Sequence, residues 1–596
     1  MRWYFEPRPE QGTDDDEEAS QGLASFPASL LQRHGAAVLD PQRAAVVYGW
    51  PPPGQGGPEP DSAAPAPGTP EPRSTVYRTR TLLIPPDLLG GPANGAISEV
   101  LGEIGLELGG PAVEDTANLR PGLPVTVVLT PHAPVDDTPA RPVVVDAWHA
   151  LQTLRAAALS PRYRDVLPPE TVEQIGLEHL LVGSTIMGSP ASEGGAISGS
   201  PASEGGGITG PASTDSYLFA GWDTRTPVDL YMDAPPRESA DQCEKRYGRR
   251  PVVAVLDTGV REHPWLDVGS NNTQLGGFVA VDQVMQTSIY NNGQLAANAG
   301  DRPRHLIRDP WDWPLTANKL IGELDTDTGH GTFIAGIVRQ LAPDAQVLAI
   351  RIMHSDGIVY EGDLVYALGL LASRVEAAEN GDMDQMVDLV SLSLGYFSET
   401  RADRAYTFAL WRAIEPLLEM GVAVIAAAGN FSSGRRFYPA AFAELPAPGG
   451  VPVISVGALN PNGSKALFSN DGRWVRAWAT GAAVVSTLPT DVNGSREPEV
   501  RVPAAVPPGV PDPHERASLD PDDYRGGLAV WSGTSFSGPA IAGVIAAELM
   551  AAAGSGGGPG TASGGGSGGS LSLADPGANA AVHRIVHALG HLGWAG

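Results

Sequence analysis

Short apolar runs rich in valine and isoleucine alternate with helical patterns from Pro251 onward, and this alternation constrains the fold more than any other feature. The runs are almost continuous, as in strands that are buried on both faces of a sheet. Alternating strands and helices build a mostly parallel sheet through right-handed crossovers. The sequence therefore predicts a doubly wound α/β domain over residues 251–596, with helices on both faces and strands at 252–256, 347–350, 389–392, 422–425 and 453–456.

Helices are expected between these strands and after them. The patterns indicate helices at 332–341, 363–379, 402–420 and 580–589. The same domain is expected to carry an inserted loop near 269–313, a second insertion at 488–526 and a glycine-rich run at 554–569.

Composition divides the chain before this domain into three parts. Residues 1–75 are acidic and then proline-rich, so they bury little apolar surface, and we expect them to be largely disordered. Residues 159–250 are interpreted as a linker, because the sequence Gly-Ser-Pro-Ala-Ser-Glu-Gly-Gly occurs twice in them. Between the two, residues 76–158 are expected to form a small α+β domain, with strands at 81–84, 125–129 and 143–145 and helices at 97–108 and 147–158.

Charge and cysteine content argue against several classes of protein. The net charge of -29, from 39 basic and 68 acidic residues, argues against a nucleic-acid-binding surface. Cys243 is the single cysteine, so no internal disulfide can form. Residues 1–7 contain no apolar signal segment, and no run of about 18 uncharged apolar residues indicates a membrane span. We therefore expect a cytoplasmic protein without nucleic-acid or membrane partners.

Four polar motifs stand where a doubly wound domain places its functional residues. Asp257 and Asn430 each follow a predicted strand directly. His330 lies between two glycines at a helix start, and Ser535 lies behind a Gly-Thr turn at the start of another helix. The carboxyl ends of parallel strands share one edge of the sheet, and helix N-termini stabilise negative charge. Each motif alone is common in turns and caps, but together they indicate one site.

The order Asp, His, Asn, Ser resembles that of the subtilisin-type serine peptidases, and the resemblance covers about residues 250–596. The motifs that carry it are Asp257-Thr258-Gly259, His330-Gly331-Thr332, Ala428-Gly429-Asn430 and Gly533-Thr534-Ser535.

The resemblance implies a role for each of the four residues. Ser535 would be the nucleophile, His330 the general base and then acid, and Asp257 the group that orients the imidazole. Asn430 would form the oxyanion hole with the backbone N–H of Ser535. These residue types suit the chemistry, because a serine hydroxyl needs an adjacent base and an amide N–H is a suitable donor to an oxyanion. The resemblance thus implies a serine endopeptidase that acts through an acyl-enzyme.

The same resemblance implies that a peptide substrate binds as an extended strand, with side-chain pockets for selection. Phe437, ahead of Tyr438-Pro439, would lie near the floor of the first pocket, where the family frequently has a small residue. We therefore expect a shallow pocket that prefers small or modest side chains at P1. The implied substrate-binding residues are Ser393, Leu394, Gly395, Ala428, Gly429 and Phe437.

Other classes are weighed against this interpretation. An α/β-hydrolase would show a Gly-x-Ser-x-Gly motif and the order Ser, Asp, His, but Ser537 stands where the second glycine would be. The sedolisin family carries a glutamate where this chain has His330 and an aspartate where it has Asn430. A non-catalytic or latent scaffold that binds peptides remains the alternative function.

Cofactors and partners follow from the same resemblance. No cofactor is expected. Secreted relatives often bind calcium, but no ligand set for calcium can be matched in this sequence. Asp325 and Asp327 are interpreted as solvated loop residues or as carboxylates behind the site. Polypeptide substrates are expected, together with a regulatory partner for the N-terminal region. Residues 76–158 stand where the family carries an inhibitory propeptide, so a latent precursor is expected; an unrelated regulatory domain is the other interpretation.

Overall fold

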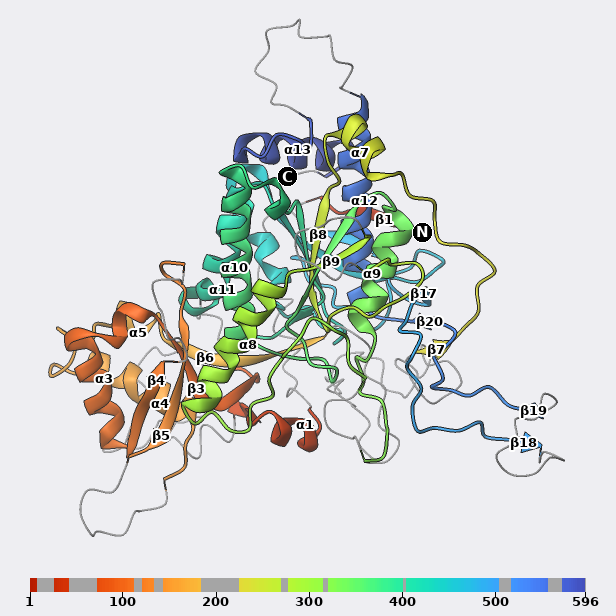
Figure 1. Ribbon diagram of the computed structural model, residues 1–596. Helices are drawn as coiled ribbons and strands as arrows, with labels where there is room; N and C mark the ends of the chain where they lie inside the picture. The colour runs from red at the N-terminus through yellow and green to blue at the C-terminus, as the bar shows by residue number, and fades with distance from the viewer. Residues whose placement is uncertain are drawn as a thin grey trace, which may run out of the picture.

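The computed structural model describes residues 1–7, 26–41, 72–111, 120–132, 143–183, 225–268, 277–314, 320–399, 404–502, 516–555 and 571–594. Figure 1 shows a smaller domain, coloured orange, packed beside a larger one.

The larger domain is built on an eight-stranded sheet with the order β1-β16-β15-β14-β12-β8-β10-β9. All neighbouring strands are parallel except β1 with β16, and the strands from β8 to β15 are buried along their length. The predicted strands correspond to β8, β10, β12, β14 and β15. In chain order the eight are β1 (Trp3–Phe5), β8 (Val252–Asp257), β9 (Val279–Val281), β10 (Gln346–Arg351), β12 (Leu389–Leu392), β14 (Ala423–Ala427), β15 (Val453–Leu459) and β16 (Ala477–Thr480).

Helices cover both faces of this sheet, so the predicted α/β fold class is confirmed. Figure 1 shows α9 and α12 on one side and α8, α10 and α11 on the other. The helices of this domain are α7 (Ala240–Tyr247), α8 (Gln283–Asn298), α9 (His330–Leu341), α10 (Glu361–Glu379), α11 (Arg404–Glu419), α12 (Thr534–Ser555) and α13 (Ala578–His591). Two small sheets complete it: β17 (Val484–Thr487), β20 (Leu528–Trp531) and β7 (Thr226–Pro227) in one, and β18 (Arg501–Val502) and β19 (Arg516–Ala517) in the other.

The smaller domain has its own apolar core between a sheet and two helices, α3 (Gly91–Glu103) and α4 (Ala147–Leu159). Its sheet has the order β11-β6-β3-β5-β4, with β2 added beside β3 and β13 beside β6. Short helices α1 (Ala28–Arg33) and α5 (Pro169–Val172) flank it. The strands are β2 (Ala36–Val38), β3 (Val76–Ile84), β4 (Leu106–Pro111), β5 (Val125–Pro131), β6 (Gly176–Gly183), β11 (Ile358–Tyr360) and β13 (Leu394–Gly395).

Strand β6 joins the two domains into one structure. It pairs antiparallel with β3 of the small domain and with β11 and β13 of the large domain. Buried ion pairs reinforce this junction: Arg78 on β3 donates two hydrogen bonds of 2.7 Å to the carboxylate of Asp301. The charge-assisted hydrogen bonds of such a pair offset part of the desolvation cost, and removal of one partner would leave a buried unpaired charge.

Several predicted boundaries in the N-terminal part were wrong. Residues 1–75 were expected to be largely disordered, but residues within 3–5 and 28–38 form β1, α1 and β2. The strands β1 and β2 pair with β16 and β3, and composition does not reveal these hydrogen bonds. Most of the remaining residues of this segment lie outside the described ranges. The helix predicted at 97–108 ends at Glu103, because Gly105 takes a φ of +76° and β4 follows. Residues 143–145 form no strand but lead into Asp146, the N-cap of α4.

The predicted linker and the predicted inserted loop also contain regular structure. Strand β6 lies inside the predicted linker, whose repeats fall outside the described residues. The region 269–313 is not a loop, because β9 joins the central sheet and α8 follows it. The insertion at 488–526 contains β18 and β19, and most of the glycine-rich run lies outside the described residues.

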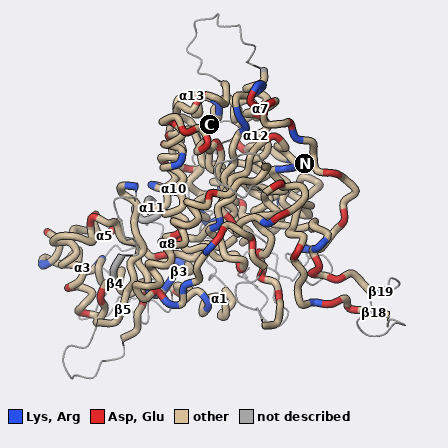
Figure 2. Tube along the Cα trace, viewed as in Figure 1, with Lys and Arg blue, Asp and Glu red and all other residues tan. Residues whose placement is uncertain are grey.

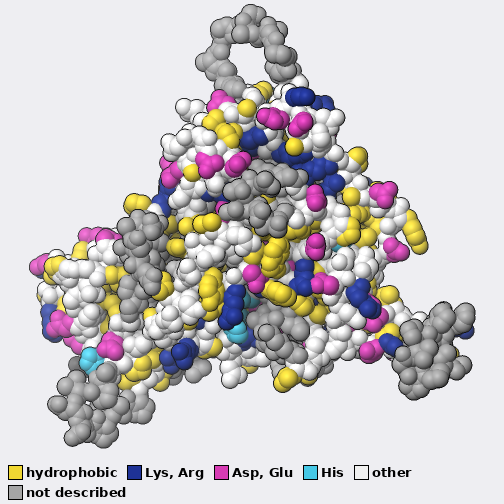
Figure 3. Space-filling model, in the orientation of Figure 1, with side chains coloured by type: hydrophobic (Ala, Val, Ile, Leu, Met, Phe, Trp, Pro, Cys, Tyr) yellow, Lys and Arg dark blue, Asp and Glu magenta, His cyan; other side chains and the backbone are white. Residues whose placement is uncertain are grey.

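The described surface carries mixed charge. Figure 2 shows Lys and Arg interspersed with Asp and Glu in both domains, and on the face in Figure 3 hydrophobic side chains lie in small groups among polar ones. One described helix, over Thr534–Gly554, is long and apolar enough to cross a membrane, but 78% of its most apolar window is buried inside the protein. That burial is typical of a core helix.

Candidate active site

Asp257 and His330 form the best-defined polar pair of the predicted site. Asp257 is the last residue of β8 and His330 the first of α9, and both side chains are buried. The imidazole Nδ1 donates to Asp257 Oδ1 at 2.7 Å. The helix approaches the strand closely enough that a Cβ on Gly331 would lie 2.1 Å from the Gly259 carbonyl oxygen, so the glycine of the His330-Gly331 motif is sterically required.

The environment of His330 favours a basic imidazole. Burial acts to lower the pKa of His330, but the charge of Asp257 and its hydrogen bond outweigh burial and the pKa is raised. Because Nδ1 donates to the carboxylate, the other nitrogen, Nε2, is the one able to accept a proton. Nε2 is buried and has no hydrogen-bond partner among the described residues.

Ser535 lies at the start of α12, as predicted, but its hydroxyl does not reach His330. Its Oγ donates to the carbonyl oxygen of Ser393 at 3.4 Å, and Ser393 Oγ donates back to the Ser535 carbonyl at 3.0 Å. The next residue, Phe536, places its ring centroid 5.5 Å from that of His330. The structure thus brings Ser535 into the neighbourhood of the imidazole without forming the Ser–His hydrogen bond.

Asn430 is fixed beside Ser535 by a residue that sequence reasoning missed. The backbone N–H and the hydroxyl of Thr534 both donate to Asn430 Oδ1, each at 2.9 Å. The Thr534 hydroxyl also accepts from the N–H of Gly429 at 3.1 Å. These two donors set the orientation of the amide, with its oxygen toward α12. The sequence signal that could have indicated this role is the position of Thr534 between Gly533 and Ser535 of the motif.

The predicted substrate-pairing segment is already paired with another part of the chain. Leu394 and Gly395 form β13, which lies antiparallel to β6 with Leu394 opposite Gly183 and Gly395 opposite Val182. On its other edge Val182 lies opposite Ile358 of β11. Strand β6 therefore occupies the position that an extended peptide would need beside this segment.

Phe437 lies between the two predicted walls of the first pocket. Its buried ring faces Gly395 and Gly429: a Cβ on Gly395 would meet it at 2.3 Å and a Cβ on Gly429 at 3.0 Å. Two further aromatic rings pack on it, those of Phe397 and Phe431. Ala428 is tied to the neighbouring loop by a 2.7 Å bond from the Asn470 side chain to its carbonyl oxygen.

The interpretation of Asp325 and Asp327 as solvated loop residues was wrong, because both are buried. Asp325 accepts a 2.7 Å hydrogen bond from the Ser355 hydroxyl, and Asp327 accepts one of 2.9 Å from Thr326. They lie behind the site as structural carboxylates.

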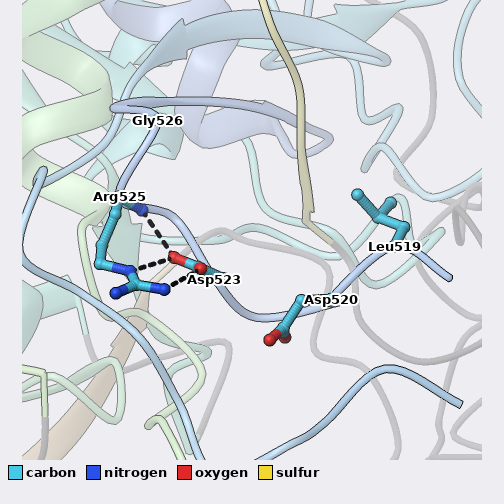
Figure 4. A pocket seen from close by; sticks show the side chains of 5 residues that line it. All are labelled: Leu519, Asp520, Asp523, Arg525 and Gly526. Atoms are coloured by element: carbon cyan, nitrogen blue, oxygen red, sulfur yellow. Dashed lines mark hydrogen bonds and ion pairs between the residues drawn. The ribbon is translucent and has the colours of Figure 1, made fainter. Parts of the chain in front are cut away.

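Within the described ranges, no group of three or more His, Cys, Asp or Glu side chains is placed to hold a metal ion. A pocket of about 520 Å³ lies near the β18–β19 pair. Its lining residues, drawn in Figure 4, are Leu519, Asp520, Asp523, Arg525 and Gly526. None of the predicted site residues lines it, and its Asp523 and Arg525 pair with each other.

Comparisons with known proteins place part of the chain in a peptidase family. A model of the subtilase family of peptidases (Peptidase S8) matches residues 248–558. Thermophilic serine proteinase from Bacillus sp. (strain AK1) is 28% identical over 46% of this chain and 55% of its own length. Serine protease AprX from Bacillus subtilis (strain 168) is 27% identical over 51% of this chain and 64% of its own. The chain therefore spans between about half and two thirds of the length of these two relatives.

One solved structure is also similar to part of the chain. The crystal structure of a cold adapted subtilisin-like serine proteinase is 19% identical, over 51% of this chain and 76% of that one, with a TM-score of 0.27.

Proposed function

The chain belongs to the subtilase family, and from this premise we propose that it is a serine endopeptidase that hydrolyses polypeptides through an acyl-enzyme. The observation that carries the proposal is the buried 2.7 Å pair of Asp257 and His330, beside a helix start where Thr534 holds Asn430 next to Ser535. The test is labelling by a fluorophosphonate probe, which modifies an activated serine. Labelling of Ser535 supports the enzyme, and its absence from processed and unprocessed protein alike supports the non-catalytic scaffold.

The proposed reaction assigns one task to each residue. Ser535 Oγ turns from the Ser393 carbonyl to His330 Nε2, gives it the proton and attacks the peptide carbonyl carbon. The oxyanion that forms accepts hydrogen bonds from the Asn430 amide and the Ser535 backbone N–H. His330 then gives its proton to the leaving amine, and a water molecule hydrolyses the ester with His330 again as base. Asp257 stabilises the imidazolium in both steps.

We propose further that the small domain keeps this site latent through β6. Gly183 lies opposite Leu394, and the adjacent Ser393 is bonded to the Ser535 hydroxyl. The chain that leaves β6 therefore starts beside the nucleophile. We propose self-cleavage at the first peptide bonds beyond Gly183, inside the predicted linker of residues 159–250. A cytoplasmic location, the absence of a required cofactor and a regulatory partner stay predictions.

His179→Leu is expected to release this latency. His179 on β6 lies buried between Glu361 and Glu399, at 2.7 and 2.9 Å, and although burial opposes it, their charges raise its pKa to about 10. The substitution removes the positive charge that both carboxylates share, which costs about 3 kcal/mol or more in a buried site. We expect the peptidase activity of freshly made, unprocessed chain to rise about 10²-fold.

The control for that measurement is Arg162→Leu, which removes an exposed ion pair inside the small domain and should leave the activity unchanged. Because the folded pKa of His179 is raised, the stabilisation from the ion pairs is fully present below its unfolded pKa of about 6.5 and is lost progressively as pH rises to about 10. The latency of unprocessed wild type should thus weaken over this pH range, and its activity should rise. Equal activity of the His179→Leu and wild-type precursors would contradict latency through β6.

Phe437→Gly is expected to change the P1 preference. The ring of Phe437 fills the space between Gly395 and Gly429, so wild type should prefer alanine or serine over phenylalanine at P1. Removing the ring opens room for an aromatic side chain, and kcat/KM for P1 phenylalanine should rise about 10–100-fold relative to P1 alanine. Peptides that differ only at P1 measure this ratio, with Phe442→Leu, a core aromatic substitution, as control. A wild-type preference for phenylalanine would refute the shallow pocket.

A further inference from the structure

A buried carboxylate outside the four motifs lies against the first turn of α9. Asp312, in the segment that follows α8, is completely buried. Its Oδ1 accepts from the backbone N–H of Gly329 at 3.2 Å, and its Oδ2 accepts from the Thr332 hydroxyl at 3.0 Å. These two partners flank His330, one residue before it and two residues after it.

Helix α9 needs a cap that its own sequence does not supply. Its N-cap is Gly329, with a φ of +83° and no side chain to accept from the first-turn N–H groups. An unsatisfied donor at a buried helix start is costly, and a carboxylate there also interacts favourably with the helix dipole. Asp312 accepts from the N–H of this N-cap residue, from a segment 17 residues away in sequence, while the first-turn N–H groups of His330 and Gly331 donate to the Asp327 carbonyl and the Thr258 hydroxyl.

Asp312 is itself held against the turn that follows Asp257. Its N–H donates to the Val260 carbonyl at 3.4 Å, and Arg261 Nη1 donates to its carbonyl oxygen at 3.2 Å. The N–H of Arg261 donates to the Thr332 hydroxyl at 3.1 Å. One hydrogen-bonded unit thus connects the end of β8, the Asp312 segment and the helix that begins with His330.

The charges around Asp312 couple it to the same pair. Burial raises the pKa of Asp312 to about 7, and the charge of Asp257 adds to this, while the bonds from Gly329 and Thr332 and the charge of Arg351 act against it. His330 in turn faces three carboxylates, those of Asp257, Asp327 and Asp312, each of which favours its protonated form.

We propose that Asp312 is a positioning residue for His330, which fixes the first turn of α9 and whose negative charge stabilises the imidazolium during catalysis. The inference rests on the proposed peptidase function. The direction of the effect of Asp312 on the pKa of His330 follows from charge. A nearby anion makes the imidazole a stronger base, and removal of the anion makes it a weaker one.

Asp312→Asn is the informative variant. Its amide has the size of the carboxyl group and is able to accept from Gly329 and donate to Thr332, so both hydrogen bonds are retained while the charge is lost. We expect kcat to fall about tenfold with KM within twofold, and the acid limb of the pH profile of kcat/KM to move down by about 0.5 unit or more. Asp282→Asn is the control, because Asp282 is the N-cap residue of α8, where it accepts from the Met285 N–H, and its other partner is Arg374 rather than α9. It should leave the profile unchanged.

A second readout does not depend on activity. In a Ser535→Ala background with labelled histidine, NMR gives the titration midpoint of His330 directly. Adding Asp312→Asn should lower that midpoint by about 0.5 unit or more and convert a broadened titration, coupled to Asp312, into a single step. An unchanged midpoint, or a wild-type pH profile of the active Asp312→Asn enzyme, would overturn the proposal. If wild type neither hydrolyses peptides nor reacts with the probe, the proposed function fails instead, while the midpoint still reports on Asp312.

Discussion

Ser535→Ala is expected to abolish peptide hydrolysis, lowering kcat by about 10⁴-fold or more, because it removes the hydroxyl that is proposed to form the ester. The substitution removes one oxygen, whose contact in the structure is the weak 3.4 Å bond to the Ser393 carbonyl, so the fold should be retained. Circular dichroism and thermal unfolding check the fold, and a peptide assay measures the loss.

The same variant tests self-cleavage. Wild type should yield two fragments, with a new N-terminus at one of the first residues beyond Gly183, whereas Ser535→Ala should stay at 596 residues. Mass spectrometry of both proteins after purification gives the answer. Ser537→Ala is a matched control, since that hydroxyl lies two residues further along α12 and bonds to the Ala479 carbonyl at 3.0 Å. Processing of Ser535→Ala by the purified chain itself would rule out Ser535 as the nucleophile.

Asp257→Asn is expected to lower kcat by about 10⁴-fold with little change in KM. An amide in this position donates to Nδ1 through its NH₂ group and so favours the tautomer with the proton on Nε2. That tautomer is unable to accept the Ser535 proton. The loss of the charge that keeps the pKa of His330 raised acts in the same direction.

Kinetics on one peptide at several pH values measures this loss. Asp325→Asn serves as the control, because Asp325 is also buried near the site but accepts its hydrogen bond from Ser355 and makes none to His330. It should retain most of the wild-type kcat. An Asp257→Asn enzyme within tenfold of wild type would mean that the 2.7 Å pair has no part in the reaction.

Local pattern was sufficient to predict five strands of the central sheet and the residues at its edge, but not β1, β9 and β16. Continuous apolar runs such as the one in β8 are buried on both faces whatever surrounds them, and the polar residue that ends such a run lies at the carboxyl edge. The pairing of Asp257 with His330 was implied by the resemblance to the subtilisin-type peptidases, and the structure shows it. The orientation of the Ser535 hydroxyl could not be predicted, because it depends on the Ser393 carbonyl, 142 residues away in sequence.

Strand β6 shows where sequence reasoning stopped. It was included in the predicted linker because of the repeats within residues 159–250. Its apolar run contains Glu178 and His179, and a charge is tolerated in a buried strand only when it is paired. The partners of His179 lie on the large domain, at Glu361 and Glu399, about two hundred residues further along the chain.

The sequence by itself thus determined the α/β architecture and the identity of the four motif residues, because both depend on periodicity and short spacing. Only the tertiary structure decided that β6 pairs with the predicted substrate-pairing segment, that Thr534 orients Asn430 and that Asp312 bonds to residues on both sides of His330. Each of these depends on hydrogen bonds between segments distant in the sequence, and such bonds leave no periodic trace in the chain.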